Sequence, residues 1–419
     1  MFRKATFRSL TSLGVYTLTH CAVDFSCAFL LFRLRYLNAI DDRQAYFAFV
    51  LYNLLAFGLE FLIGLLFTAR TARFSAVLGL FVLIGGVALG TVVSESALVR
   101  EGGLGPTESA VNYLGLGSET ARLSLYSLWA CLLAGIGNAF FHVGGGIDSL
   151  TLNRGKFWRS GVFISSGALG LAFGVLSGKN LIQGFAFEHI FMILGACAVA
   201  VWLFCRYDDN ESLQENSPET NSVAKPVAEK RSVLFASTVV FALLLVIGAR
   251  SAVGFLAPEL WGIKTALTFN SLALAFAAFL GKFVGGFCAD LFGPRLFGAA
   301  ALLASIPFLC YCSSPEMFWI GVALLNSSTA ITLTSAAAFC GKKVGFAFGL
   351  TTLALLAGFY VYDYVSDVLE RSDCSDVVTI VMAGTLVVSA LILACAATKR
   401  ERNVCIPDSS LSSARIDRN

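Results

Sequence analysis

The sequence predicts an all-α polytopic membrane protein, with twelve transmembrane helices arranged in two six-helix halves. Hydrophobic residues make up 57% of the chain and charged residues only 14%, whereas charged residues are about a quarter of an ordinary soluble domain. The 37 Phe and 39 Gly fit this class, because bulky apolar side chains face lipid and small residues lie where helices touch. Apolar runs and one long polar segment then define the spans and the two halves.

Twelve apolar runs are long enough to cross a bilayer, which takes about 20 residues in a helix. The expected spans are 10–32, 44–67, 74–93, 123–148, 160–178, 182–205, 233–257, 265–289, 296–312, 317–340, 344–363 and 377–397. Most Lys and Arg lie in the connections on one side, which include both chain ends, and such connections face the cytoplasm. We therefore expect a multi-pass protein of the plasma (cytoplasmic) membrane with both termini cytoplasmic.

A polar segment without hydrophobic periodicity divides the spans into two sets of six, and its composition is typical of a flexible linker. The expected domains are an N-terminal six-helix half (1–205), a cytoplasmic linker (206–232), a C-terminal six-helix half (233–398) and a cytoplasmic tail (399–419). The halves also repeat weakly, since Glu60 and Lys282 each precede a glycine by four residues near the end of a span. Many transporters are built from such repeats, with the substrate site between them.

Ionisable side chains inside spans are the main functional candidates, because a charged group at mid-membrane costs about 2.5–3.5 kcal/mol on insertion scales. His20 and Asp24 are four residues apart in the first span, and Asn138 and His142 have the same spacing in the fourth. This spacing places both members of a pair on one helix face. Each pair could handle a proton or a substrate, or could form a buried hydrogen bond that only fixes helix packing.

Three further charged residues inside spans are candidates for the substrate or proton pathway. Glu60 is about 15 Å along its helix from Arg70, at 1.5 Å per residue, and could be a buried, titratable carboxyl. The long stem of Lys282 is expected to extend toward the cytoplasmic face. Arg250 is permanently charged, so an anion, water or strong acceptors must surround it. Its partner could be an acid of the protein, Asp24 or Glu60, or an anionic substrate.

A charged turn between two apolar runs contains Gly286, Asp290, Gly293 and Arg295. Gly286 and the glycines just before it form a small-residue helix face, and Gly293 followed by proline reverses the chain. This Gly-x-x-x-Asp-x-x-Gly-x-Arg spacing resembles the signature loop of the major facilitator superfamily.

Other motifs extend this resemblance over nearly the whole chain, and within the superfamily the sequence is similar to the fosmidomycin-resistance-type efflux proteins. The motifs are His20-x-x-x-Asp24, the run 135–142, the glycines of 167–174, Arg250-Ser251 with Pro258, the signature loop, and the run 341–349. The resemblance implies a central cavity lined by spans 1, 4, 7 and 10, with His20, Asp24, Asn138, His142, Arg250 and Asn326 in it. It also implies proton-driven exchange by alternating access, with Asp290 in a contact that holds the cytoplasmic side shut.

Departures from the family pattern leave the direction of transport open. Thr68 replaces the acid of the first signature loop, Val143 follows His142 in place of proline, and Val175 replaces the proline of an antiporter motif.

Other function classes lack support in the sequence. It shows no nucleophile elbow, phosphate loop or paired metal-ligand motif, so we expect no enzyme activity, no cofactor and no metal. The net charge of +3 does not indicate a nucleic-acid partner. We expect a monomeric secondary transporter of a small molecule in the lipid bilayer, coupled to protons and exporting. An uptake symporter, or a receptor or lipid-translocating relative on the same scaffold, remains open. Whether Cys310, Cys312 or Cys374 form a disulfide is not decided.

Overall fold

The computed structural model describes residues 2–37, 40, 42–101, 119–151, 156–205, 233–260, 268–311, 314–341, 343–371 and 374–398. The regular structure within them is entirely helical. The helices are α1 (Phe2–Tyr36), α2 (Asp42–Gly58), α3 (Glu60–Leu66), α4 (Ala72–Glu101), α6 (Glu119–Thr151), α7 (Phe157–Gly178), α8 (Phe187–Phe204), α10 (Val233–Leu260), α11 (Thr268–Phe292), α12 (Pro294–Cys310), α13 (Pro315–Ser327), α14 (Thr329–Cys340), α15 (Val344–Arg371) and α16 (Ser375–Ala396). Within these described ranges, eleven stretches are long and apolar enough to span a membrane, and the shorter apolar helix α12 completes the twelve expected spans.

Two of these spans are interrupted. α2 and α3 together form one span that breaks at Leu59, directly after Gly58. Glycine weakens a helix interior because its backbone loses the most entropy on folding. α13 and α14 form another span that breaks at Ser328, where Ser327 and Thr329 also donate hydroxyl hydrogen bonds to carbonyls three residues earlier. Such bonds compete with the regular hydrogen bonds of the helix backbone. The expected spans 44–67 and 317–340 are therefore each made of two helices.

Glycines allow close helix contacts among the first six spans. α7 packs on α1 through a row of glycines, and a Cβ atom on Gly178 would lie 2.8 Å from the carbonyl oxygen of Phe29. α4 and α6 approach in the same way, because a Cβ on Gly79 would lie 2.5 Å from the carbonyl oxygen of Gly137. Small residues are the usual means of close helix contact in a bilayer.

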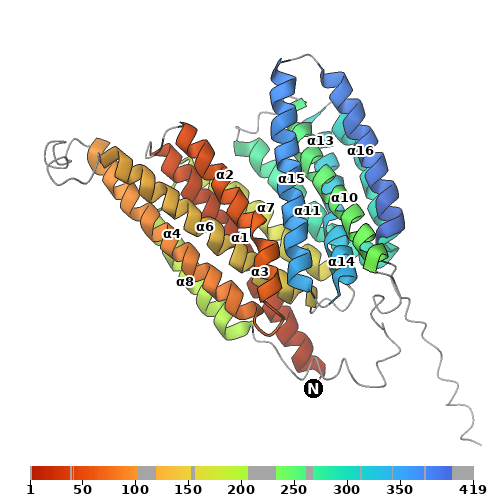
Figure 1. The fold of residues 1–419 in the computed structure, drawn as a ribbon, viewed down its shortest axis with the longest axis horizontal. Coiled ribbons are helices and arrows are strands. Elements are labelled where there is room, and N and C mark those ends of the chain that lie inside the picture. Colours follow the sequence, from red (N-terminus) through yellow and green to blue (C-terminus); the bar gives the residue numbers. More distant parts are fainter. Residues whose placement is uncertain are drawn as a thin grey trace, which may run out of the picture.

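The helices gather into two groups, with α1 to α8 on one side and α10 to α16 on the other (Figure 1). One hydrophobic cluster comes mostly from the first group and a second mostly from the other. The groups meet where α7 contacts α11 and where α3 contacts α15. The expected linker 206–232 and tail 399–419 lie outside the described residues, as does Cys312.

Close backbone contacts between the groups lie at the end of the bundle where α1 begins. There the start of α7 packs on the end of α11, since a Cβ on Gly286 would lie 2.8 Å from the carbonyl oxygen of Phe157. At the same end α3 packs on the start of α15, and a Cβ on Gly345 would lie 2.8 Å from the carbonyl oxygen of Gly64. Contacts of this kind close that end of the interface between the two groups.

Candidate functional site

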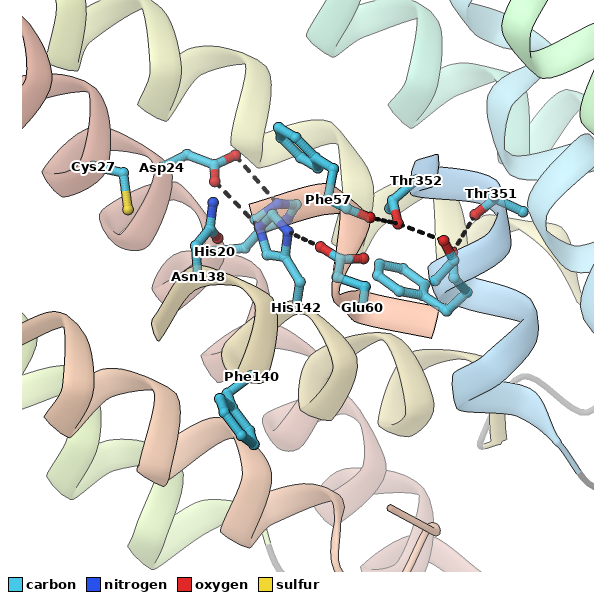
Figure 2. Close-up of polar contacts among 12 residues, drawn as sticks. His20, Asp24, Cys27, Phe57, Glu60, Asn138, Phe140, His142, Thr351 and Thr352 are labelled. Carbon is cyan, nitrogen blue, oxygen red and sulfur yellow. Dashed lines mark hydrogen bonds and ion pairs between the residues drawn. The ribbon is translucent and has the colours of Figure 1, made fainter. Parts of the chain in front are cut away.

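Four ionisable side chains converge between α1, α3 and α6, and we call them the His–acid cluster: His20, Asp24, Glu60 and His142 (Figure 2). Nε2 of His20 lies 3.3 Å from Oδ2 of Asp24. His142 bridges the two acids, because its Nε2 lies 3.2 Å from Oδ1 of Asp24 and its Nδ1 lies 3.0 Å from Oε1 of Glu60. Both four-residue pairs from the sequence therefore contribute to one region, and Glu60 joins it from a different span.

Each nitrogen–oxygen contact of the His–acid cluster needs a hydrogen, because a carboxylate can only accept. Nδ1 of His20 also carries a hydrogen, since it lies 2.9 Å from the carbonyl oxygen of Phe163. All four ring nitrogens thus face oxygen atoms. Four protons satisfy the four contacts, and the two rings and two acids then have a net charge of zero. Loss of one proton leaves two acceptors facing each other.

The His–acid cluster is shielded from the surface. Glu60 is 0% exposed and His142 is 5% exposed, while the side chain of Asp24 retains 17% exposure. The His20 ring stacks on Phe163 with ring centroids 4.8 Å apart. Charges in such surroundings interact much more strongly than in water. Gain or loss of a proton will therefore change how these helices attract one another.

Glu60 occupies a special position because it is the first residue of α3, directly after the helix break. Its Oε1 contacts His142, whereas Oε2 has no hydrogen-bond partner among the described residues. At the same break the Phe57 carbonyl accepts a hydrogen bond of 3.5 Å from the Thr352 hydroxyl of α15. The His–acid cluster is thus adjacent to the contact between the two helix groups.

Asn138 lies close to the cluster but bonds elsewhere. Its Nδ2 donates to the hydroxyl oxygen of Tyr52 at 2.7 Å, and its Oδ1 has no partner within the described ranges. Tyr52 was not predicted as a site residue. A single tyrosine in an apolar span has no characteristic spacing to other polar residues, so the sequence cannot distinguish it from a tyrosine that only packs in the core.

Arg250 has no acidic partner in the described part of the chain. It is 5% exposed, and its Nη1 donates to the Thr329 hydroxyl oxygen. That hydroxyl in turn donates to the carbonyl oxygen of Asn326 at 2.6 Å. The Asn326 side chain bonds to the Val322 carbonyl of its own helix, at 2.9 Å. Pairing of Arg250 with Asp24 or Glu60 is therefore not realised.

Thr329 was also missed as a site residue. The sequence did contain a usable signal, because three hydroxyl residues follow one another at 327–329 inside an apolar span. Such residues can bond to the backbone or to a buried donor.

Lys282 does not extend to the cytoplasmic face, and that expectation is wrong. The side chain is half-buried on α11 and lies near enough to Arg250 and Asp24 to interact electrostatically with both. It forms no ion pair or hydrogen bond with any described residue. The backbone at this level packs closely on α7, with the carbonyl oxygen of Lys282 2.7 Å from where a Cβ of Gly161 would be.

The signature-loop acid caps a helix of the other group. Asp290 Oδ1 accepts from the backbone N–H of Phe157 at 3.1 Å and Oδ2 accepts from that of Trp158 at 2.9 Å. Phe157 is the first residue of α7, so the carboxylate faces the positive end of the helix dipole. Gly286, one turn earlier on α11, provides the close approach described above.

The other two residues of the signature loop have local roles. Gly293 adopts a φ of 91° at the N-cap of α12, a backbone conformation that side chains disfavour. Arg295 turns away from α7, and its Nε donates to the carbonyl oxygen of Ala397 beyond the end of α16, at 2.7 Å. This bond ties together two helices of the C-terminal group.

A divalent cation is chemically compatible with part of the cluster. One ligand atom from each of His20, Asp24 and His142 lies within 4.8 Å of the others. Imidazole and carboxylate together suit first-row transition metals. Protons satisfy the same atoms in the arrangement described above, so metal dependence is a matter for experiment.

Comparison with known proteins supports the fold. Neither a protein-family model nor a curated protein sequence matches this chain. Solved structures do match: the Escherichia coli fucose:proton symporter FucP in an outward conformation has a TM-score of 0.63 at 14% identity, over 93% of this chain and 100% of that chain. The human organic anion transporter MFSD10 also has a TM-score of 0.63 at 14% identity, over 92% of this chain and 99% of that one.

A third match is a bacterial homologue of the iron transporter ferroportin, in an outward-facing state. Its TM-score is 0.58 at 12% identity, over 93% of this chain and 99% of that chain. These matches cover nearly the full length of every chain compared. The protein thus has the twelve-helix fold seen in these major facilitator superfamily structures.

Proposed function

We propose that this protein is a secondary active transporter that moves a small molecule across the membrane by alternating access, coupled to protons. The observation that carries the coupling is the His–acid cluster, in which four contacts need four protons. A site that only fixed helix packing could be built from apolar groups at lower cost. Two histidines and two acids in mutual contact can instead lose and regain a proton.

The coupling follows from the position of the cluster. Glu60 begins the helix that packs on α15 of the other group, and His142 connects it to Asp24 on α1. When one contact loses its proton, acceptor–acceptor repulsion acts between these helices. The proton affinity then differs between conformations, which is the thermodynamic condition for coupling. The closed end near the start of α1 and the outward-facing fold matches support one of the two required states.

The test is transport by the purified protein in proteoliposomes, with an imposed pH gradient and a panel of metabolites and drugs. Wild type should show flux that depends on the gradient. Asp24→Asn should abolish this flux and retain exchange of the same compound without a gradient. Glu188→Gln is a matched control, because Glu188 is exposed at the start of α8.

Undiminished pH-driven flux in Asp24→Asn would contradict the proton role. Loss of flux on adding a chelator, with recovery on adding a divalent metal, would assign the cluster to a metal instead. No flux of any compound under any gradient would favour the receptor or lipid-translocating alternative.

The direction of transport has two candidates. The resemblance to fosmidomycin-resistance-type proteins favours efflux by exchange with protons. The fold match to a fucose:proton symporter favours uptake together with protons. The sign of the flux in the same proteoliposomes decides between them, because an inwardly directed proton gradient drives accumulation only in a symporter.

We also propose a plasma-membrane location with both termini cytoplasmic, a division into halves at 206–232, and a monomer as the working unit. The distribution of Lys and Arg supports the orientation. The closed end of the interface, which includes the contact of Asp290 with α7, would then be cytoplasmic.

A further inference from the structure

Arg250 presents an unused edge of its guanidinium group. Nη1 donates to Thr329, while Nε is fully buried with no acceptor among the described residues. Thr329 is itself fixed by its bond to the Asn326 carbonyl. The hydroxyl therefore holds the guanidinium in place and leaves the edge formed by Nε and Nη2 without an acceptor among the described residues. This edge is the fork that binds both oxygens of a carboxylate.

Lys282 adds a second positive charge within electrostatic range of Arg250. It interacts electrostatically with Arg250, which is a like-charge contact, and with Asp24. Within the part of the chain that the structure describes, neither cation forms an ion pair. Two like charges in a low-dielectric interior repel strongly, so the ligand-free arrangement is unfavourable.

The acids of α10 to α16 lie elsewhere in the described part of this group. Glu259 bonds to Ser366, Asp363 bonds to Tyr46, and Asp290 caps α7. Glu316 and Asp376 lie in the first turns of α13 and α16, and Asp367 is paired with Arg371. None of these acids compensates Arg250 or Lys282. The His–acid cluster is neutral when its four contacts are satisfied, so it supplies no net compensating charge either.

We propose that Arg250 and Lys282 form the binding site for the carboxylate group of a small organic anion. This inference rests on the proposed transport function and specifies its substrate class. The carboxylate would bridge the Nε–Nη2 edge of Arg250 and Nζ of Lys282, on the side of the cluster where Asp24 lies. Its negative charge would replace two-cation repulsion with two attractive contacts.

The first test needs no ligand. Uncompensated cations destabilise the empty protein, so Lys282→Gln should raise its melting temperature by about 2 °C or more. An internal partner would instead make the variant less stable. Lys343→Gln is the control, because Lys343 is exposed just before α15. Lys282 is the better first variant, since removal of Arg250 also breaks the bond to Thr329.

The second test measures equilibrium binding to the purified full chain in detergent, without any pH gradient. The probes are sodium acetate, lactate, succinate, citrate and benzoate, each compared with its neutral amide and with sodium chloride at equal ionic strength. At least one carboxylate should raise the melting temperature while its amide does not. Arg250→Lys retains the charge but loses the fork, so its apparent Kd should rise about tenfold or more, with a similar loss in Lys282→Gln. Arg371→Lys, on the exposed end of α15, should bind as wild type does.

Absence of a carboxylate-specific effect across the panel overturns the inference, as does unchanged affinity in both Arg250→Lys and Lys282→Gln. A lower melting temperature of Lys282→Gln also overturns it. These outcomes are distinguishable from failure of the proposed function. Carboxylate binding without pH-driven flux would refute proton coupling alone, and pH-driven flux restricted to neutral compounds would refute the anion site alone.

Discussion

Nδ1 of His142 lies 3.0 Å from Oε1 of Glu60, and this contact connects the cluster to a helix break. Glu60 begins α3 directly after the break at Leu59, and α3 packs on α15 of the other helix group. The same imidazole contacts Asp24 through its other nitrogen. A change in protonation on α1 can therefore reach the interface between the groups through one aromatic ring.

Glu60→Gln should impair coupling strongly. A glutamine keeps the size and one acceptor oxygen, but it has no exchangeable carboxyl charge. We expect pH-driven flux to fall by about tenfold or more, as for loss of an interaction worth roughly 1.4 kcal/mol, while exchange without a gradient persists. Proteoliposome flux measures this. Glu188→Gln should transport normally, and equal pH-driven flux in Glu60→Gln and wild type would remove Glu60 from the pathway.

Asp290→Asn should open the end of the interface at which α7 begins. The carboxylate accepts two backbone hydrogen bonds at that helix start, and an anion there is worth about 0.3–1 kcal/mol. In a cysteine-free background, a cysteine at the buried Ser160 should react with a membrane-impermeant maleimide about two- to fivefold faster in the variant.

Asp376→Asn provides the control for this experiment, because Asp376 lies in the first turn of its own helix, α16. It should leave the labelling rate unchanged. An unchanged rate in Asp290→Asn as well would show that the Asp290 contact does not hold this end closed.

Gly349→Ala should separate α3 from α15. A Cβ atom at Gly349 would overlap the backbone nitrogen of Phe61, and overpacking of this kind typically costs about 1–3 kcal/mol. Spin labels at Leu66 and Lys343, at neighbouring ends of these helices, should show a larger share of long distances. Gly384→Ala is the control, since nothing lies within 4 Å of a Cβ there. Identical distance distributions in both variants would mean that this contact tolerates the added methyl group.

Carboxylate binding should strengthen as the pH falls. Each proton lost from the His–acid cluster makes it more negative by one unit, whichever group releases it, and a nearby anion is then repelled. Affinity should therefore rise up to about tenfold between the deprotonated and protonated forms, and by the same linkage anion binding should take up protons. Binding titrations across a pH series measure this, with Asp24→Asn as the variant in which the dependence should shrink.

The groups that act on Asp24 in this prediction come from several helices. They are His20, Cys21 and Cys27 on α1, Tyr52 on α2, Glu60 on α3, His142 on α6 and Lys282 on α11. Affinity that falls as the pH is lowered would reverse the sign of the linkage and favour exchange of substrate against protons.

Much of the architecture could be predicted from the sequence because the bilayer constrains it so strongly. A lipid-spanning chain must satisfy its backbone hydrogen bonds internally, so apolar runs of sufficient length become helices. Charged side chains inside spans could be recognised as functional candidates because it costs free energy to place them in the bilayer. The four-residue spacing placed His20 on the same helix face as Asp24. The helix breaks at Leu59 and Ser328 were missed, because both lie inside runs that remain apolar on either side.

The tertiary structure alone decided which charges meet. Periodicity within one helix cannot show that His142 bridges Asp24 and Glu60, since these residues belong to three different helices whose rotation is set by packing. It also cannot show that Arg250 binds Thr329 and no acid of the described chain. The sequence by itself predicted twelve apolar spans and the costly polar groups inside them. How these groups neutralise one another, and which two cations form no ion pair in the described structure, depends on contacts between helices far apart in the chain.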